Sequence, residues 1–300
     1  MRVPSGRVGV AGAVLIALIA MTSAGRAQEA TTFDHAGLAR QALETHIRPG
    51  YAAVVTSAQT LAKELDGYCT RQTGERRRAV DRAFDGLVSS WGRIEHIRFG
   101  PIATGNRLER LFFWPDRRGL GARQVAATLR ERDPSALDPV ALAGKRVAIQ
   151  GLGALETALF EAPSKHADDR AYRCAFAKSI ATNIANIASA ILKEWTDPDL
   201  YSRHWLDPGP GNPHFLKRQE TTLALAKALD NGLERVRDEW IAAPLGLGPQ
   251  RRRLTPVLAT SGRTLRLFLA GVEGLHRLFT TAGMHKAIID TTKAHPDVTV

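Results

Sequence analysis

The sequence predicts an all-α protein built from helical bundles, and three observations lead to this prediction. Apolar residues recur at spacings of three and four almost throughout the chain, which places them on one face of an α-helix. Proline falls between these stripes and not within them. No run of residues alternates apolar and polar side chains as a half-buried β-strand would.

Six apolar stripes define the expected long helices. They run along 51–65, 80–94, 149–159, 176–195, 216–240 and 265–279. Pro49-Gly50 should kink or split the first helix, and Gly100-Pro101 should end the second. Asp138-Pro139, an N-cap followed by proline at the first helical position, should open the third helix. We expect irregular structure over Phe99–Arg118 and Asp197–Pro213.

The helix count suggests two halves of similar size. About 270 residues beyond an N-terminal leader are enough for about two four-helix bundles. The chain divides near 161–169, so we expect an N-terminal bundle over 28–165 and a C-terminal bundle over 166–300. Together these would form one domain.

Residues 1–27 have the layout of a secretory signal. A basic start precedes the apolar run Val8–Met21, and small residues lead to a cleavage site between Ala27 and Gln28. The run is shorter than the roughly 20 apolar residues of a membrane-spanning helix, and no cysteine follows it for lipid attachment. We therefore expect a periplasmic protein without a lipid anchor and without a transmembrane segment in the mature chain.

The charge balance is basic, with 41 Lys and Arg against 30 Asp and Glu. Most of the excess is arginine scattered through amphipathic segments. The two tight clusters, Arg76–Arg78 and Arg251–Arg253, lack the interleaved aromatic residues on which single-stranded nucleic acid stacks. We expect no nucleic-acid partner. A solvated face, or contact with anionic lipid or wall polymer, suits an exported protein better.

The chain has two cysteines, Cys69 and Cys174. In an oxidising compartment an even number favours a disulfide, and two free buried thiols are the alternative. A bridge over about 105 residues would stabilise the fold by about 4–5 kcal/mol in the chain-entropy model.

Glu156 is the most informative polar residue, because it lies on an apolar helical stripe. A carboxylate there must be paired, bound to a cation or protonated. Gly151 and Gly153 each cost about 1 kcal/mol inside a helix, which indicates close approach of a backbone or a ligand. Two interpretations stay open: an ion pair with Arg98 or Arg110, and a ligand or metal role.

A second polar group precedes it in the chain. Trp91, Glu95 and Arg98 follow at spacings of four and three, which would put them on one helical face, and Trp114 and Asp116 come shortly after. An aromatic ring, an acid and a base can line a polar pocket. The same residues can also form a core tryptophan covered by a salt bridge.

These motifs resemble those of the imelysin-like family of exported bacterial proteins. The resemblance is carried by Trp91 with Ile94–Pro101, Phe113–Asp116, Gln150–Glu156 and the tail from Ser261 to Gly283, in matching order. It covers essentially the whole mature chain. It implies two helical bundles packed side by side, a ligand site at their interface and an envelope location. Members of the family are linked to iron acquisition and were once classed as metallopeptidases.

The chain departs from the family's Gly-x-His-x-x-Glu signature. Gly151 and Glu156 match its outer positions, but Gly153 occupies the position of the histidine. An imidazole and a carboxylate one helical turn apart can grip a metal or activate water, so the loss of one of them argues against peptidase activity.

The sequence therefore predicts a non-enzymatic binding or accessory protein for iron or another divalent metal. The candidate ligand-binding residues are Glu156, Arg98, Glu95, Trp91, Trp114, Asp116 and Gly151, with Glu156 as a weak metal ligand. An anionic ferric chelate would suit Arg98 and Arg110. The alternatives are a degenerate metallopeptidase or metallohydrolase, and an envelope protein that holds a protein partner.

Overall fold

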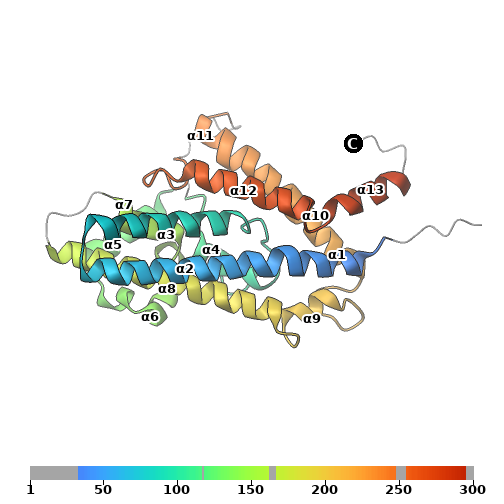
Figure 1. Cartoon of the computed structure of the whole chain (residues 1–300), viewed down its shortest axis with the longest axis horizontal. Helices are drawn as coiled ribbons and strands as arrows, with labels where there is room; N and C mark the ends of the chain where they lie inside the picture. The colour runs from blue at the N-terminus through green and yellow to red at the C-terminus, as the bar shows by residue number, and fades with distance from the viewer. Residues whose placement is uncertain (1–32, 117, 162–166, 248–254, 295–300) are drawn as a thin grey trace, which may run out of the picture. The chain divides into compact units, whose positions relative to one another are not determined.

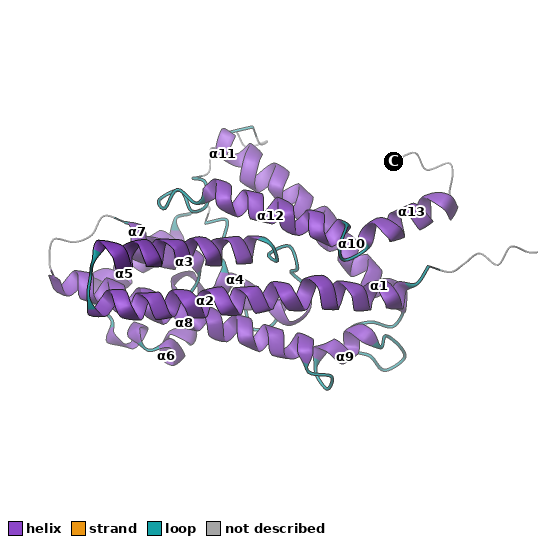
Figure 2. Ribbon diagram, viewed as in Figure 1, coloured by secondary structure: helices purple, strands orange, loops and turns teal. Residues whose placement is uncertain are grey.

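The computed structural model describes residues 33–116, 118–161, 167–247 and 255–294, which contain helices and no β-strand (Figures 1 and 2). The predicted all-α class is confirmed. The predicted signal over 1–27 and the cluster Arg251–Arg253 lie outside the described residues. The α-helices are α1 (His35–Ala42), α2 (Arg48–Thr70), α3 (Gly74–Gly92), α4 (Arg107–Leu111), α5 (Leu120–Glu131), α6 (Pro139–Ala143), α7 (Leu152–Phe160), α8 (Ala167–Thr196), α9 (Tyr201–Leu206), α10 (Arg218–Arg235), α11 (Ala243–Leu245), α12 (Thr264–Phe279) and α13 (Met284–Ala294).

Three long helices form the centre of the core. In Figure 1, α2 lies between α3 and α8, and it packs more extensively on these two than on any other helix. Their apolar stripes meet there, so that Leu61, Phe84 and Phe176 are fully buried. The shorter helix α7, which carries Glu156, packs against α8.

Helices α10 and α12 pack on each other, and α12 also reaches the central group. Helix α12 lies across α3, and α10 packs against α1. Gly92, the last residue of α3, makes the first contact close, because a Cβ there would meet the backbone carbonyl of Leu267 in α12 at 3.0 Å.

The boundary expected near residue 165 falls just before α8. That helix packs most extensively on α2, and residues from Phe33 onward form one compact unit. The division into bundles over 28–165 and 166–300 stays a prediction.

Helix α8 is long and apolar enough to cross a membrane by length and composition. Its candidate window has a mean hydropathy of 1.2, and 61% of that window is buried inside the protein. Contact with α2, α6 and α7 covers it, so its apolar character is that of a central core helix.

Several predicted helix ends were wrong. The helix carrying Trp91 ends at Gly92 and not at Gly100. Asp138 does cap a helix, accepting the N–H of Val140 at 3.0 Å, but that helix is α6 and it ends at Ala143. The third stripe instead belongs to a 3-10 turn and to α7, because Gly151 is extended and interrupts the helix.

Three further expectations changed in detail. The interruption near Pro49 is a π-helical turn over Leu43–Ile47 that joins α1 to α2 without a break. The two stretches expected to be irregular each contain a short helix, α4 in the first and α9 in the second.

The predicted disulfide is confirmed. Cys69 in the last turn of α2 is bonded to Cys174 in α8, with the two Cα atoms 5.6 Å apart. The bridge therefore ties together the two helices that make the most extensive contact in the core.

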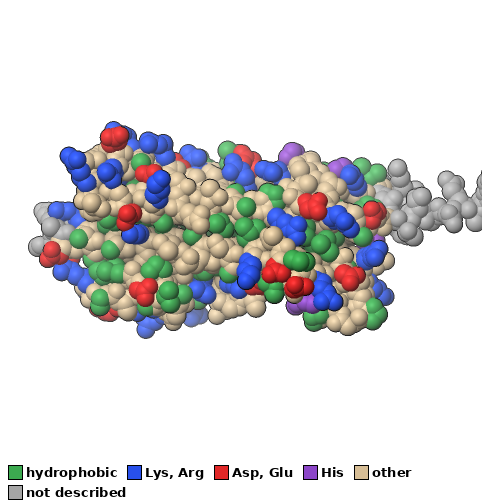
Figure 3. Space-filling model, turned by 60° about the horizontal axis from the view of Figure 1, so that its bottom comes forward, with side chains coloured by type: hydrophobic (Ala, Val, Ile, Leu, Met, Phe, Trp, Pro, Cys, Tyr) green, Lys and Arg blue, Asp and Glu red, His purple; other side chains and the backbone are tan. Residues whose placement is uncertain are grey.

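Charged side chains are spread over the surface shown in Figure 3. Lys and Arg alternate there with Asp and Glu, and they do not gather into one basic patch on that face. This distribution agrees with the scattered arginines of the sequence.

Candidate functional site

Glu156 lies on α7, and its side chain is turned into the protein, with 8% of the residue exposed. Its Oε1 accepts a hydrogen bond of 2.7 Å from the backbone N–H of Ser261, in the turn that precedes α12. The ion pairs considered from the sequence are wrong. Arg98 donates to Glu95 and Arg110 donates to the side chain of Gln150.

Burial raises the pKa of Glu156, and the nearby charge of Glu161 acts in the same direction. The hydrogen bonds from Ser261 and the charge of Arg263 oppose this shift without cancelling it. The carboxyl group is therefore held where its charged form is costly, and a positively charged or hydrogen-bond-donating ligand would stabilise that form.

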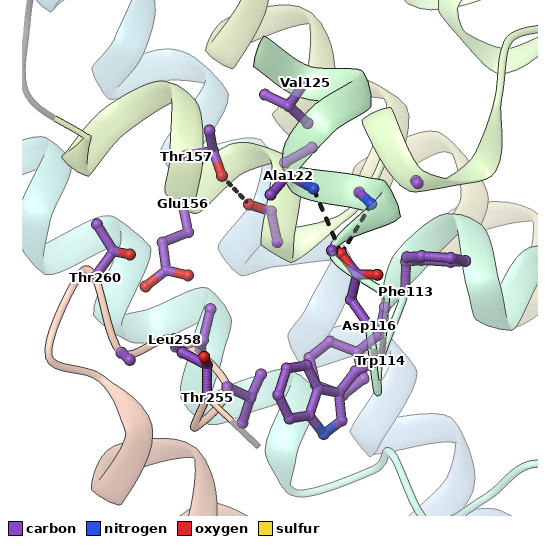
Figure 4. A pocket seen from close by; sticks show the side chains of 18 of the residues that line it. Phe113, Trp114, Asp116, Ala122, Val125, Glu156, Thr157, Thr255, Leu258 and Thr260 are labelled. Atoms are coloured by element: carbon purple, nitrogen blue, oxygen red, sulfur yellow. Dashed lines mark hydrogen bonds between the residues drawn. The ribbon is translucent and has the colours of Figure 1, made fainter. Parts of the chain in front are cut away.

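A cavity of about 250 Å³ opens beside Glu156 (Figure 4). Three parts of the chain form its wall: the segment around 112–116 with the start of α5, the face of α7, and the segment 255–260. The charged residues in this wall are Asp116, Glu156 and Glu161, and the described lining contains no Lys or Arg. The aromatic residues in the wall are Phe112, Phe113 and Trp114.

Asp116 builds the wall through backbone contacts. Its Oδ1 accepts the N–H of Leu120 at 2.7 Å, and its Oδ2 accepts the N–H of Gly121 at 2.8 Å. These bonds cap the start of α5 and hold it against the segment that carries Trp114. The buried indole N–H of Trp114 has no acceptor among the described residues.

Gly151, which matches the signature, and Gly153, which replaces its histidine, have different environments. A Cβ on Gly151 would collide with the backbone of Arg110 and Leu111, which explains why the chain has glycine there. A Cβ on Gly153 would meet nothing within 4 Å, and Gly153 lies in the cavity wall. The position that carries histidine in the family signature is therefore open space beside Glu156.

Glu95, Arg98 and Trp91 lie outside this cavity. Glu95 is 2% exposed and forms ion pairs with Arg98 at 2.6 Å and with Arg235 of α10 at 3.2 Å. Trp91 is buried in the core, where its ring packs near that of Phe112.

Arg98 and Arg235 line a second cavity, of about 470 Å³, whose wall holds both acidic and basic side chains. The structure therefore separates the predicted residues into two places. Trp114, Asp116 and Glu156 line the first cavity, and Gly151 supports it by close packing.

Sequence reasoning missed a buried histidine pair next to Glu95. The Nε2 atoms of His46 and His96 are 2.8 Å apart, so one ring donates and the other accepts. Burial lowers the pKa of His96 to about 3, with the charges of Arg235 and Arg98 acting in the same direction. Burial and the neighbouring His96 lower the pKa of His46 to about 2. Both rings are therefore neutral. The pair could not be predicted from sequence because the two histidines lie 50 residues apart in the chain.

The residues of the first cavity do not fit a bare metal ion. Within the described ranges, no group of three His, Cys, Asp or Glu side chains is placed to hold one. Both oxygens of Asp116 already accept backbone N–H groups, and one oxygen of Glu156 does so. A cation would meet too few free ligand atoms here.

Comparisons with known proteins agree with the fold. The family model described as Imelysin matches residues 47–296. Among solved structures, an imelysin-like protein from Psychrobacter arcticum 273-4 has a TM-score of 0.70 and 20% sequence identity, over 86% of this chain and 80% of that chain. At this identity the likeness shows the fold alone. Comparison with curated proteins finds no matching sequence.

Proposed function

Because the chain belongs to the imelysin family, we propose that it is an exported, non-enzymatic binding protein and that the cavity beside Glu156 is its ligand site. One observation carries the proposal. A buried carboxylate that accepts the backbone N–H of Ser261 faces a cavity whose described wall contains no basic residue.

Two features support an exported location. The first 27 residues have the layout of a cleavable secretory signal. The disulfide between Cys69 and Cys174 belongs to proteins that fold in an oxidising compartment. Together they favour the bacterial periplasm.

A binding role is favoured over catalysis because the described wall of the cavity contains no histidine or cysteine to act together with Glu156. Gly153 stands where the signature has histidine, and among the described residues no imidazole lines the cavity beside Glu156 to complete a metal site or to move a proton. A degenerate metallohydrolase would need zinc or iron in the purified protein. Elemental analysis that shows well below one metal ion per chain would remove that alternative.

The wall of the cavity favours a small ligand that carries positive charge and some apolar surface. Asp116, Glu156 and Glu161 supply negative charge, and Trp114 adds an aromatic ring, which attracts ammonium groups. An anionic ferric chelate fits poorly, since Arg98 and Arg110 are not in this wall. A role in iron or other metal acquisition would use a neutral or cationic complex.

Calorimetric titration tests the proposal with defined probes: a monoalkylammonium, a polyamine, ferric citrate, and iron, zinc and copper salts. We expect heat with the ammonium probes, and binding at least about ten-fold weaker in Glu156→Gln, which keeps the hydrogen bond from Ser261 but removes the charge. Glu131→Gln, at an exposed position on α5, is the matched control.

The proposal is contradicted if no ammonium probe binds the wild type, or if the Glu156→Gln variant binds these probes as tightly as the wild type does. Binding of a bare metal salt that the Glu156→Gln change abolishes would support a metal site in place of the ammonium site.

A further inference from the structure

Helix α12 is apolar on two opposite faces. Its inward face, which includes Leu267 and Leu278, packs against α3 and α10. On the outward face Leu265, Leu269 and Val272 follow at spacings of four and three, which aligns them along the helix. These three side chains, the α12 stripe, are 77%, 63% and 48% exposed.

The exposed apolar surface of the described residues is concentrated in the C-terminal helices. Beyond the α12 stripe it includes Leu223, Leu233, Ile241, Leu245 and Leu247. The π-helical segment Val236–Ala242, which leads into α11, packs against α12. Soluble monomers rarely expose apolar side chains in a continuous patch, so a stripe of this kind marks a surface that docks on something.

Basic residues flank the stripe. Between residues 255 and 289 the chain carries Arg263, Arg266, Arg277 and Lys286 against the single acid Glu273. Glu273 is paired with Arg93, which follows α3, and Asp85 of α3 pairs with both Arg263 and Arg266. Arg277 and Lys286 are therefore in excess of the acids around the stripe. An apolar stripe with basic neighbours is the pattern of a helix that lies in the headgroup region of a membrane.

We propose that the outward face of α12 docks on the surface of a bilayer that contains anionic phospholipid. The side chains of the α12 stripe enter the boundary between headgroups and acyl chains, and Arg266, Arg277 and Lys286 meet the lipid phosphates. The helix lies parallel to the membrane and does not cross it. This proposal is independent of the ligand site, because Glu156 lies on α7.

The charge favours a lipid surface over a second copy of the chain. A two-fold dimer through α12 would place the same patch of each protomer against the other. The basic residues around both stripes would then approach each other, whereas an anionic bilayer supplies the opposite charge.

Vesicle co-sedimentation tests this proposal. The protein without residues 1–27 is suitable, since residues from Phe33 onward form one compact unit. Vesicles of phosphatidylglycerol and phosphatidylcholine in equal parts are compared with vesicles of phosphatidylcholine alone, at low and high salt. The variant Leu265→Glu/Leu269→Glu places two charges in the stripe. Val140→Glu is the matched control, because Val140 on α6 is 78% exposed.

We expect the wild type to bind the anionic vesicles at low salt and to lose this binding at high salt. It should not bind vesicles of pure phosphatidylcholine. The double variant should bind at least about ten-fold more weakly and keep the circular dichroism of the wild type, whereas Val140→Glu should bind like the wild type. The proposal is overturned if the wild type does not bind, or if both variants lose binding equally. It is also overturned if light scattering shows a wild-type dimer that the double variant dissociates.

Discussion

Glu156 on α7 and Ser261 before α12 are joined by a hydrogen bond of 2.7 Å, although 105 residues separate them in the chain. This bond holds the segment 255–260 against the face of α7 and so closes one side of the cavity. The same hydrogen bond holds the carboxyl group of Glu156 in its buried position. The burial of this group therefore affects the stability of the fold and the dependence of that stability on pH.

The change Glu156→Gln should raise the Tm at pH 7. The pKa of Glu156 is raised above its ordinary value of 4.5, so the folded protein binds this proton more tightly than the unfolded chain does. The stabilising effect of the protonated form is complete below pH 4.5 and is lost as the pH rises through the folded pKa. Glutamine has no charge to bury, and its oxygen still accepts from Ser261.

The measurement is the Tm of both proteins from pH 4 to pH 8 by differential scanning fluorimetry. The difference between them should shrink toward acid pH. Glu131→Gln, which changes an exposed acid on α5, should show no such trend. A Glu156→Gln protein that is less stable than the wild type at pH 7 would contradict this reading of the site.

The paired changes Gly151→Ala and Gly153→Ala should act in opposite directions. A Cβ at residue 151 meets the backbone of Leu111, so we expect a loss of about 1–3 kcal/mol in the free energy of unfolding. A Cβ at residue 153 meets open space in the first turn of α7, so alanine should add up to about 1 kcal/mol there. Urea unfolding of the three proteins measures both effects, and equal losses would show that the cavity edge is packed at Gly153.

Reduction of the Cys69–Cys174 disulfide should lower stability substantially. The closed loop spans 105 residues, for which the chain-entropy model gives about 4–5 kcal/mol, or a Tm lowered by about 10 °C or more. Thermal unfolding with and without reductant measures the change. The variant Cys69→Ser/Cys174→Ser should already unfold at the lower temperature and should not respond to reductant.

The buried pair His46 and His96 should make the protein sensitive to acid. Their folded pKa values of about 2 and about 3 lie below the unfolded value of 6.5, so the stabilising effect of the neutral rings is complete above pH 6.5 and is lost as the pH falls. Between about pH 6 and pH 4 the unfolded chain gains up to two more protons than the folded protein, a slope of up to about 2.7 kcal/mol per pH unit. Urea unfolding at several pH values should show a smaller slope for His46→Gln/His96→Gln.

The sequence predicted what depends on local pattern. The spacing of apolar residues identified α2, α3, α8, α10 and α12, because one face of each is buried. It also identified Glu156 as a buried acid, since its neighbours on the stripe are apolar. The disulfide followed from the number of cysteines and the expected compartment.

Partners that come from another helix could not be predicted in this way. Glu95 pairs with Arg235, which lies 140 residues further along the chain, and nothing in either segment indicates that α10 passes there. The prediction that Glu95 and Arg98 line the same site as Glu156 was wrong for the same reason. The expected helical face of Trp91, Glu95 and Arg98 also failed, because α3 ends at Gly92, where α12 crosses closely.

The open space at Gly153 bears on how the signature histidine could be regained. Among the described residues, no atom lies within 4 Å of a Cβ built at Gly153, so a side chain could begin there beside Glu156 without a clash. The difference between this chain and the complete signature is therefore chemical and not architectural. The fold leaves space at the position of the signature histidine. The single substitution Gly153→His would place an imidazole one helical turn from Glu156, and the two side chains could then chelate one ligand.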